Sequence, residues 1–230
     1  RCLHCCEESG PDKAWRDELT REESLKLARD AVAAGIPYAA FGGGEPLAVK
    51  HIWEVLKVLV EGGTELKLET NGLPIGEREA DLLAEWKAQC VQISVDGATK
   101  KVHETVRPDG DFVGAIASIS RLVRRGLKPE FVFVPNKLNA REAVDAYRLA
   151  NDLGCRTFVT GPMMRLGRAA MAYNRLALSD AEWARTERAL KAEAQRLKEP
   201  VKLSIYPWDI LTEMRTRLDS PQAMMLVVPN

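Results

Sequence analysis

The sequence predicts an α/β fold in which a parallel sheet is covered by helices. Short runs of β-branched and aromatic residues alternate along the chain with longer stretches whose apolar residues repeat at helical spacing. The connections between the strand-type runs are long enough to be the crossovers that parallel strands require. An open sheet and a partial (β/α) barrel both fit, and in each the ligand site lies at the carboxyl ends of the strands.

Start and stop signals delimit the expected helices. Thr20 and Glu23 have the spacing of a capping box ahead of an apolar-periodic stretch, and Gly35 is a suitable terminator. The same start signal occurs at Asn139 with Glu142 and at Ser179 with Glu182. Further helices are expected over residues 47–61, 76–89 and 112–125.

Six strands are expected between these helices. They cover residues 36–41, 65–69, 91–95, 130–134, 156–160 and 202–206. We expect Arg1 to follow one more strand that is not part of this sequence. The repeating unit is therefore a strand followed by a helix, and one large domain accounts for most of the chain.

Composition excludes several classes of partner. Among 230 residues, 33 are Lys or Arg and 33 are Asp or Glu, so no overall charge attracts nucleic acid or a membrane surface. The apolar runs fall short of the roughly 20 residues that a membrane span needs. The five cysteines are odd in number, and Cys90 and Cys155 stand isolated, which argues against a disulfide framework and favours the reducing cytoplasm.

Polar and glycine residues follow the expected strands. The segments are GGGEP (42–46), TNG (70–72), DG (96–97), PNKLN (135–139) and GPMMRLGRA (161–169). Each alone is ordinary turn chemistry. Because the carboxyl ends of parallel strands meet at one edge, five such segments together predict a ligand site there.

A pair of cysteines opens the chain. Cys2 and Cys5 have C-x-x-C spacing, and in a barrel they lie in a loop at the same edge as the polar segments. Two thiolates so spaced can hold one metal centre, and soft sulfur ligands select iron–sulfur clusters or zinc. A structural zinc site would need a second pair, and a redox dithiol normally stands at a helix start rather than before a charged loop.

These segments resemble the radical S-adenosylmethionine (SAM) superfamily. RCLHC is similar to the last five positions of that family's C-x-x-x-C-x-x-C signature, and GGGEP is similar to its G-G-E-P element. ETNG resembles a further strand-end loop of the family. ISVDG, HETVR and GPMMRLGRA resemble elements of the subgroup that carries a C-terminal SPASM or twitch extension.

The resemblance implies a partial (β/α)6 TIM-like barrel. The sequence would begin inside the cysteine signature, with the first cysteine four positions before Cys2. Residues 1–206 would form the barrel core without its first strand, and residues 207–230 would begin the SPASM or twitch extension.

The resemblance also implies two cofactors and a set of binding residues. Cys2 and Cys5 would be two of the three thiolate ligands of a [4Fe–4S] cluster, whose open iron takes the amino and carboxylate groups of SAM. Gly43, Gly44 and Glu45 would hold the methionine amine of SAM. Glu69 and Ser94 would lie near the amine or ribose, and Arg107 would pair with the carboxylate.

The implied function is that of a radical SAM oxidoreductase or maturase, with no catalytic side chain assigned. The reduced cluster would cleave SAM to a 5′-deoxyadenosyl radical that abstracts hydrogen from a peptide or tetrapyrrole-like substrate. A reductase, flavodoxin or ferredoxin would supply the electron. The alternative is a non-catalytic barrel that binds zinc through C-x-x-C and docks partners.

Overall fold

A computed structural model describes residues 2–6 and 18–206, so the expected extension at 207–230 lies outside the described residues. One six-stranded sheet runs in chain order, and every neighbouring pair is parallel. Within the described residues, the first and last strands form open edges, which confirms the expected parallel sheet and partial barrel. The strands are β1 (Tyr38–Phe41), β2 (Glu65–Thr70), β3 (Cys90–Ser94), β4 (Glu130–Phe133), β5 (Thr157–Thr160) and β6 (Lys202–Ile205).

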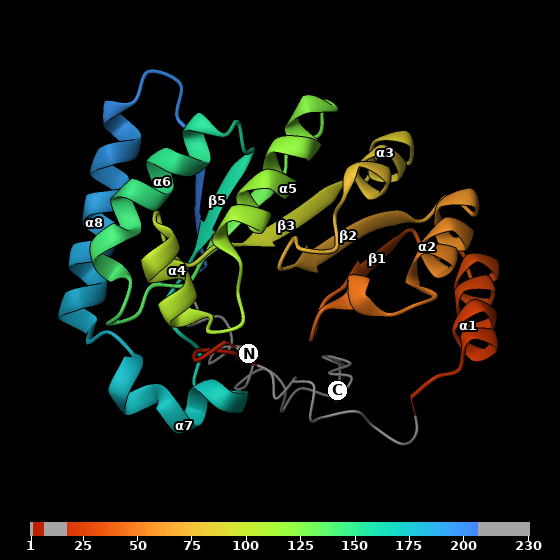
Figure 1. Ribbon diagram of the computed structural model, residues 1–230, viewed down its shortest axis with the longest axis horizontal. Coiled ribbons are helices and arrows are strands. Elements are labelled where there is room, and N and C mark those ends of the chain that lie inside the picture. Colours follow the sequence, from red (N-terminus) through yellow and green to blue (C-terminus); the bar gives the residue numbers. More distant parts are fainter. Residues whose placement is uncertain (1, 7–17, 207–230) are drawn as a thin grey trace.

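Helices form an outer arc around the strands, and α4 and α7 lie beside the N-terminal segment (Figure 1). None of the helices in the described ranges is long and apolar enough to cross a membrane. The helices are α1 (Arg21–Ala33), α2 (Ile52–Glu61), α3 (Glu77–Glu85), α4 (Lys100–Val106), α5 (Phe112–Arg124), α6 (Ala143–Asp152), α7 (Gly167–Leu176) and α8 (Asp180–Arg196), with 3-10 turns η1 (Pro46–Ala48) and η2 (Ala140–Glu142).

The core lies between the sheet and these helices, with Phe158 of β5 at its centre. Its ring stacks on Phe131 and Phe133 of β4, with centroids 5.5 and 5.8 Å away. The edge of Tyr147 from α6 meets the same ring at 5.4 Å. The hydroxyl of Tyr147 donates to the Val201 carbonyl at 2.6 Å, which satisfies its one polar atom in the core.

The two faces of the sheet differ in polarity. On β2, Leu66 and Leu68 are fully buried against the helices. Side chains alternate along a strand, so Lys67 and Glu69 point to the opposite face, where the register pairs them with Cys90 and Gln92 of β3. This opposite face is the polar interior of the partial barrel, and it leads to the carboxyl edge of the sheet.

Capping signals were correct where their partners are local. Thr20 and Ser179 both form complete capping boxes, with Glu23 and Glu182 respectively. The expected box at Asn139 is wrong, because Asn139 Oδ1 accepts the Asn136 N–H and the Glu142 carboxylate accepts the Ala98 and Thr99 N–H groups instead.

Two helical boundaries also differ from expectation. The helix expected from residue 47 begins at Ile52 after the turn η1, and the one expected over 76–89 ends at Glu85. Helices α4 and α7 were not predicted, and α7 begins inside the segment that was expected to be only a turn. Helix α4 has only 7 residues, too few to show several apolar repeats in sequence.

Phe158→Ala tests the proposed centre of the core. Removing a fully buried ring that contacts three other rings should lower the free energy of unfolding by about 3–5 kcal/mol, through lost burial and a new cavity. Val113→Ala, at a largely exposed position on α5, should change it by less than about 0.5 kcal/mol. Urea unfolding of both variants measures the difference, and equal effects would refute this description of the core.

Candidate functional site

A buried carboxylate organises the carboxyl edge of the sheet. Asp96 follows β3 and is completely buried. Its Oδ2 lies 2.5 Å from Arg107 Nε and 3.1 Å from His4 Nε2, and its Oδ1 accepts the Val134 N–H at 3.0 Å. Burial alone would raise the pKa of Asp96, but the charge of Arg107, the contact with His4 and the Val134 N–H hold it well below its usual range. Asp96 is therefore ionised and joins three separate segments.

The C-x-x-C segment lies across this edge and is held by backbone contacts. The Leu3 N–H donates to the Val106 carbonyl at the end of α4, at 3.0 Å. The Cys5 carbonyl accepts from the Ala169 N–H of α7 at 2.8 Å, and the Cys2 carbonyl accepts from Arg168 Nη1 at 3.3 Å. Cys2 and Cys5 thus lie where the sequence predicted, at the carboxyl ends of the strands.

The thiol chemistry of this segment fits a metal centre. Arg107 Nη1 lies 3.2 Å from Cys2 Sγ. Burial raises the pKa of the Cys2 thiol, and the guanidinium of Arg107 opposes that rise. Among residues 2–6 and 18–206, no group forms a hydrogen bond with the buried Nδ1 of His4.

Two soft sulfur donors suit an iron–sulfur cluster or zinc. In the described part of the chain, no group of three or more His, Cys, Asp or Glu side chains could hold a metal ion. Cys2 and Cys5 alone therefore do not make a complete metal site within the described residues.

Glu45 ties the loop after β1 to the loop after β2. Its carboxylate accepts from the Leu47 N–H at 3.2 Å, the Thr70 hydroxyl at 2.7 Å and the Asn71 N–H at 2.7 Å. Gly43 has φ +101°, a conformation that glycine adopts without strain. The glycine-rich loop is thus fixed by its own glutamate.

Glu69 and Ser94 complete the predicted set on the inner face. The Glu69 carboxylate pairs with Lys67 at 2.7 Å, and its Oε2 would lie 2.9 Å from a Cβ on Gly42, so a glycine allows its close approach. Ser94 ends β3 and is half-buried. The structure therefore brings Gly43, Gly44, Glu45, Glu69, Ser94 and Arg107 to one edge of the sheet.

A small pocket lies at this edge of the sheet. Cys2, Asn71 and Arg107 line it together with the segment that follows Arg107. The N–H of Asn71 donates to Glu45, so the pocket is lined by the cysteine segment and by the loop after β2 that Glu45 holds. His103 also lines the pocket, but its Nδ1 accepts the Asp96 N–H at 3.1 Å and its ring packs edge-on against Phe112, which fits a structural role.

The sequence interpretation assigned no role in the site to Asp96 or Asn139. Asp96 and Asn139 are fully buried polar residues, and both lie in segments that were expected at the ligand edge without a role for either side chain. A signal for Asp96 was present, because an aspartate directly after an apolar strand is placed at the carboxyl edge. Nothing local indicated the contact of Arg168 with Cys2, which joins residues 166 positions apart.

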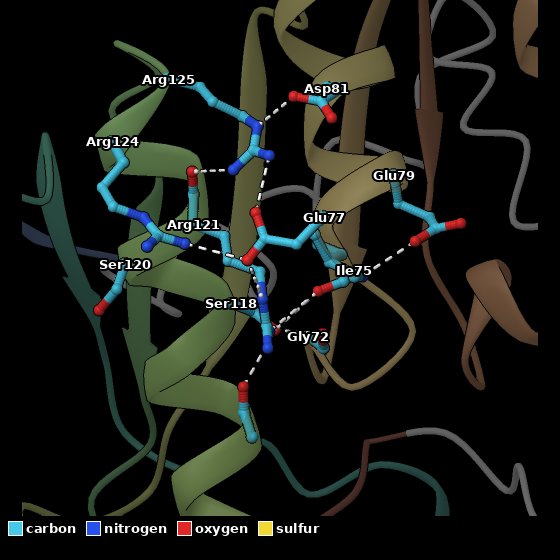
Figure 2. Close-up of polar contacts among 12 residues, drawn as sticks. Gly72, Ile75, Glu77, Glu79, Asp81, Ser118, Ser120, Arg121, Arg124 and Arg125 are labelled. Carbon is cyan, nitrogen blue, oxygen red and sulfur yellow. Dashed lines mark hydrogen bonds and ion pairs between the residues drawn. The ribbon is translucent and has the colours of Figure 1, made fainter.

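The Asp96–Arg107 pair is far less exposed to solvent than the ion pairs on the outside of the protein. Figure 2 shows Glu77 of α3 beside Arg121 and Arg124 of α5 and beside Arg125, which directly follows α5. Arg125 Nε also lies 2.6 Å from Asp81 Oδ1. The carboxylates there are largely exposed, so solvent screens their attraction. That network joins two helices and lies outside the candidate site.

Comparison with known proteins identifies relatives for most of the chain. The family model of the Radical SAM superfamily matches residues 1–167. "Mycofactocin maturase MftC" of Mycobacterium ulcerans (strain Agy99) is 29% identical over 160 residues, which cover 69% of this chain and 43% of the relative. "Pre-heme d1 synthase" of Dinoroseobacter shibae is 28% identical over 214 residues, covering 92% of this chain and 51% of the relative. The chain thus spans about half the length of these curated relatives.

Solved structures have the same fold. Streptococcus suis SuiB bound to SAM aligns with a TM-score of 0.73 at 16% identity, over 97% of this chain and 50% of that chain. SuiB bound to its precursor peptide SuiA also aligns with a TM-score of 0.73, over 93% and 48%. At this identity the likeness establishes the fold, an open parallel sheet of the partial TIM-barrel type.

Asp96→Asn should destabilise the protein strongly at neutral pH. It leaves the buried Arg107 guanidinium without a counter-charge, at a cost of about 3–5 kcal/mol in the free energy of unfolding. Asp81→Asn removes a carboxylate from an exposed pair and should have a small effect.

The same comparison predicts a pH dependence. A carboxylate with a depressed folded-state pKa contributes its full stabilisation above its unfolded pKa of about 3.9 and loses it as the pH falls further. The difference between wild type and Asp96→Asn should therefore be constant above about pH 5 and shrink below about pH 4. Denaturant unfolding at several pH values measures it, and a gap that stays constant in acid would contradict an ionised Asp96.

Proposed function

Since this chain belongs to the radical SAM superfamily, we propose that it is the core of a radical SAM oxidoreductase or maturase. Members of the family use a [4Fe–4S] cluster and SAM and catalyse radical reactions. One observation carries the proposal: Cys2 and Asn71 line the same pocket, and Asn71 is bound by Glu45 of the glycine-rich loop. A cluster ligand and a SAM-binding loop would thus face each other.

Cys2 and Cys5 are the proposed thiolate ligands in this chain, with a third cysteine expected before them. When bound, the cluster supplies the electron that cleaves SAM to methionine and a 5′-deoxyadenosyl radical, which removes a hydrogen atom from the substrate. The chain's own contribution is to fix the ligands and to limit water. Backbone bonds from Val106 and Ala169 hold the cysteine segment, and the buried Asp96 lies beneath it.

The proposed SAM-binding residues are those of the glycine-rich loop and its neighbours. Gly43 and Gly44 let the backbone approach the methionine end of SAM. The Glu45 carboxylate has about four acceptor positions, and three are occupied by the protein, which leaves capacity for an ammonium group. Glu69 and Ser94 are proposed to face the amine or ribose, and Arg107 the carboxylate, for which a guanidinium fork is suited.

The proposed substrate is a peptide or a tetrapyrrole-like precursor. Support comes from relatives named as a mycofactocin maturase and a pre-heme d1 synthase, and from a SuiB structure with a precursor peptide. The remaining proposals are that residues 207–230 begin a SPASM or twitch extension and that a reductase, flavodoxin or ferredoxin delivers the electron. A zinc-binding docking module is the less supported alternative, because the named relatives are enzymes.

Cys5→Ala tests the cluster directly. In the full-length protein, reconstituted without oxygen, this variant should contain only background iron and lack the visible absorbance of a [4Fe–4S] cluster, because one thiolate ligand is missing. Cys90→Ala is the matched control, since Cys90 begins β3 at the opposite end of that strand. A normal iron content in Cys5→Ala would refute the ligand assignment.

Glu45→Ala tests the SAM-binding loop. The cluster should still assemble, whereas SAM should bind about ten- to a hundredfold more weakly, because hydrogen bonds to a charged group contribute about 1.5–3 kcal/mol. Glu65→Ala changes the same residue type at the start of β2, far from the carboxyl edge, and should bind SAM normally. Equilibrium binding measures all three proteins, and equal affinities would count against the role of Glu45.

A further inference from the structure

We propose that Arg107 is a positioning residue that raises the reduction potential of the cluster, through a hydrogen bond from its Nη1 to the sulfur of Cys2. The inference rests on the proposed function, because it requires Cys2 to be a cluster ligand. Arg107 would thus act on the cluster itself, in addition to its proposed pairing with the carboxylate of SAM.

The guanidinium is aimed at the sulfur by a buried partner. Arg107 Nε lies 2.5 Å from Asp96 Oδ2, and Nη1 lies 3.2 Å from Cys2 Sγ. Asp96 is completely buried and also bound by the Val134 N–H, so it is a fixed anchor. Since the guanidinium is planar, fixing Nε on Asp96 sets the direction of the remaining N–H groups.

The backbone holds both ends of this hydrogen bond. The Arg107 N–H donates to the His103 carbonyl at 2.8 Å, and the Arg107 carbonyl accepts from the Gly110 N–H at 2.7 Å. On the other side, the Leu3 N–H binds the Val106 carbonyl at 3.0 Å. Leu3 directly follows Cys2 in the sequence, and Val106 directly precedes Arg107. The distance between donor and sulfur is therefore fixed by the fold.

A hydrogen bond of this kind favours the reduced cluster. Reduction adds negative charge that spreads onto the sulfur ligands, so a donor to a ligand sulfur stabilises the reduced state more than the oxidised state. The charge of Arg107 is largely offset by Asp96, so the effect depends on the directed N–H group. Lysine keeps the charge but lacks the planar fork that reaches Asp96 and Cys2 together.

The test uses the full-length protein, reconstituted and reduced without oxygen and without SAM. Protein labelled with ¹⁵N in its arginine side chains should show a nitrogen coupling to the reduced cluster in pulsed electron paramagnetic resonance. Arg107→Lys should lose that coupling. Arg168→Lys is the matched control and should retain it, because Arg168 donates to the Cys2 backbone carbonyl and not to the sulfur.

Redox titration gives a second reading. Arg107→Lys should disfavour reduction about tenfold, a fall of about 59 mV for a one-electron couple, whereas Arg168→Lys should keep the wild-type potential. Absence of the coupling in wild type, or an unchanged potential in Arg107→Lys, would overturn the inference. If Arg107→Lys assembles no cluster, the nitrogen coupling is compared in wild type and Arg168→Lys alone. Its presence in both proteins supports the inference, and its absence from wild type refutes it. If wild type itself forms no cluster, the proposed function fails instead.

Discussion

The ionised carboxylate of Asp96 is the constraint on which the site depends. A completely buried charge destabilises the folded state unless it is paired and hydrogen-bonded. The groups that pair with Asp96 must therefore stay in place for the fold to be stable. Those partners come from the cysteine segment, the end of α4 and the end of β4. One charge therefore positions three segments, and through Arg107 it reaches the sulfur of Cys2.

Glu45 plays a similar part at the neighbouring strands, where its carboxylate joins the loops after β1 and β2. The carboxyl edge is thus held by two carboxylates, and Cys2 and Asn71 line a small pocket at that edge. The exposed arginine network between α3 and α5 is richer in ion pairs, yet it only braces the outer layer (Figure 2). The two ion-pair regions differ in burial. Loss of one partner should destabilise the protein strongly at the buried Asp96 and only slightly in the exposed network.

Much of the fold could be predicted because its signals are local. Six strands and the capping boxes at Thr20 and Ser179 each need only a few adjacent residues. The box at Asn139 failed because the Glu142 carboxylate binds a tertiary partner, the Ala98 N–H 44 residues away. The cysteines and the glycine-rich loop were found from motifs. The contact of Arg107 with Cys2 was not, because it spans 105 positions and depends on the exact path of the N-terminal segment.

We propose that a cluster and SAM face each other at the edge that Asp96 and Glu45 hold together. The most direct measurement is the formation of 5′-deoxyadenosine by the full-length protein after anaerobic reconstitution. A brown, iron-containing protein should cleave SAM to 5′-deoxyadenosine and methionine only when an electron donor reduces it. A colourless, zinc-loaded protein that leaves SAM intact under the same reducing conditions would contradict the account.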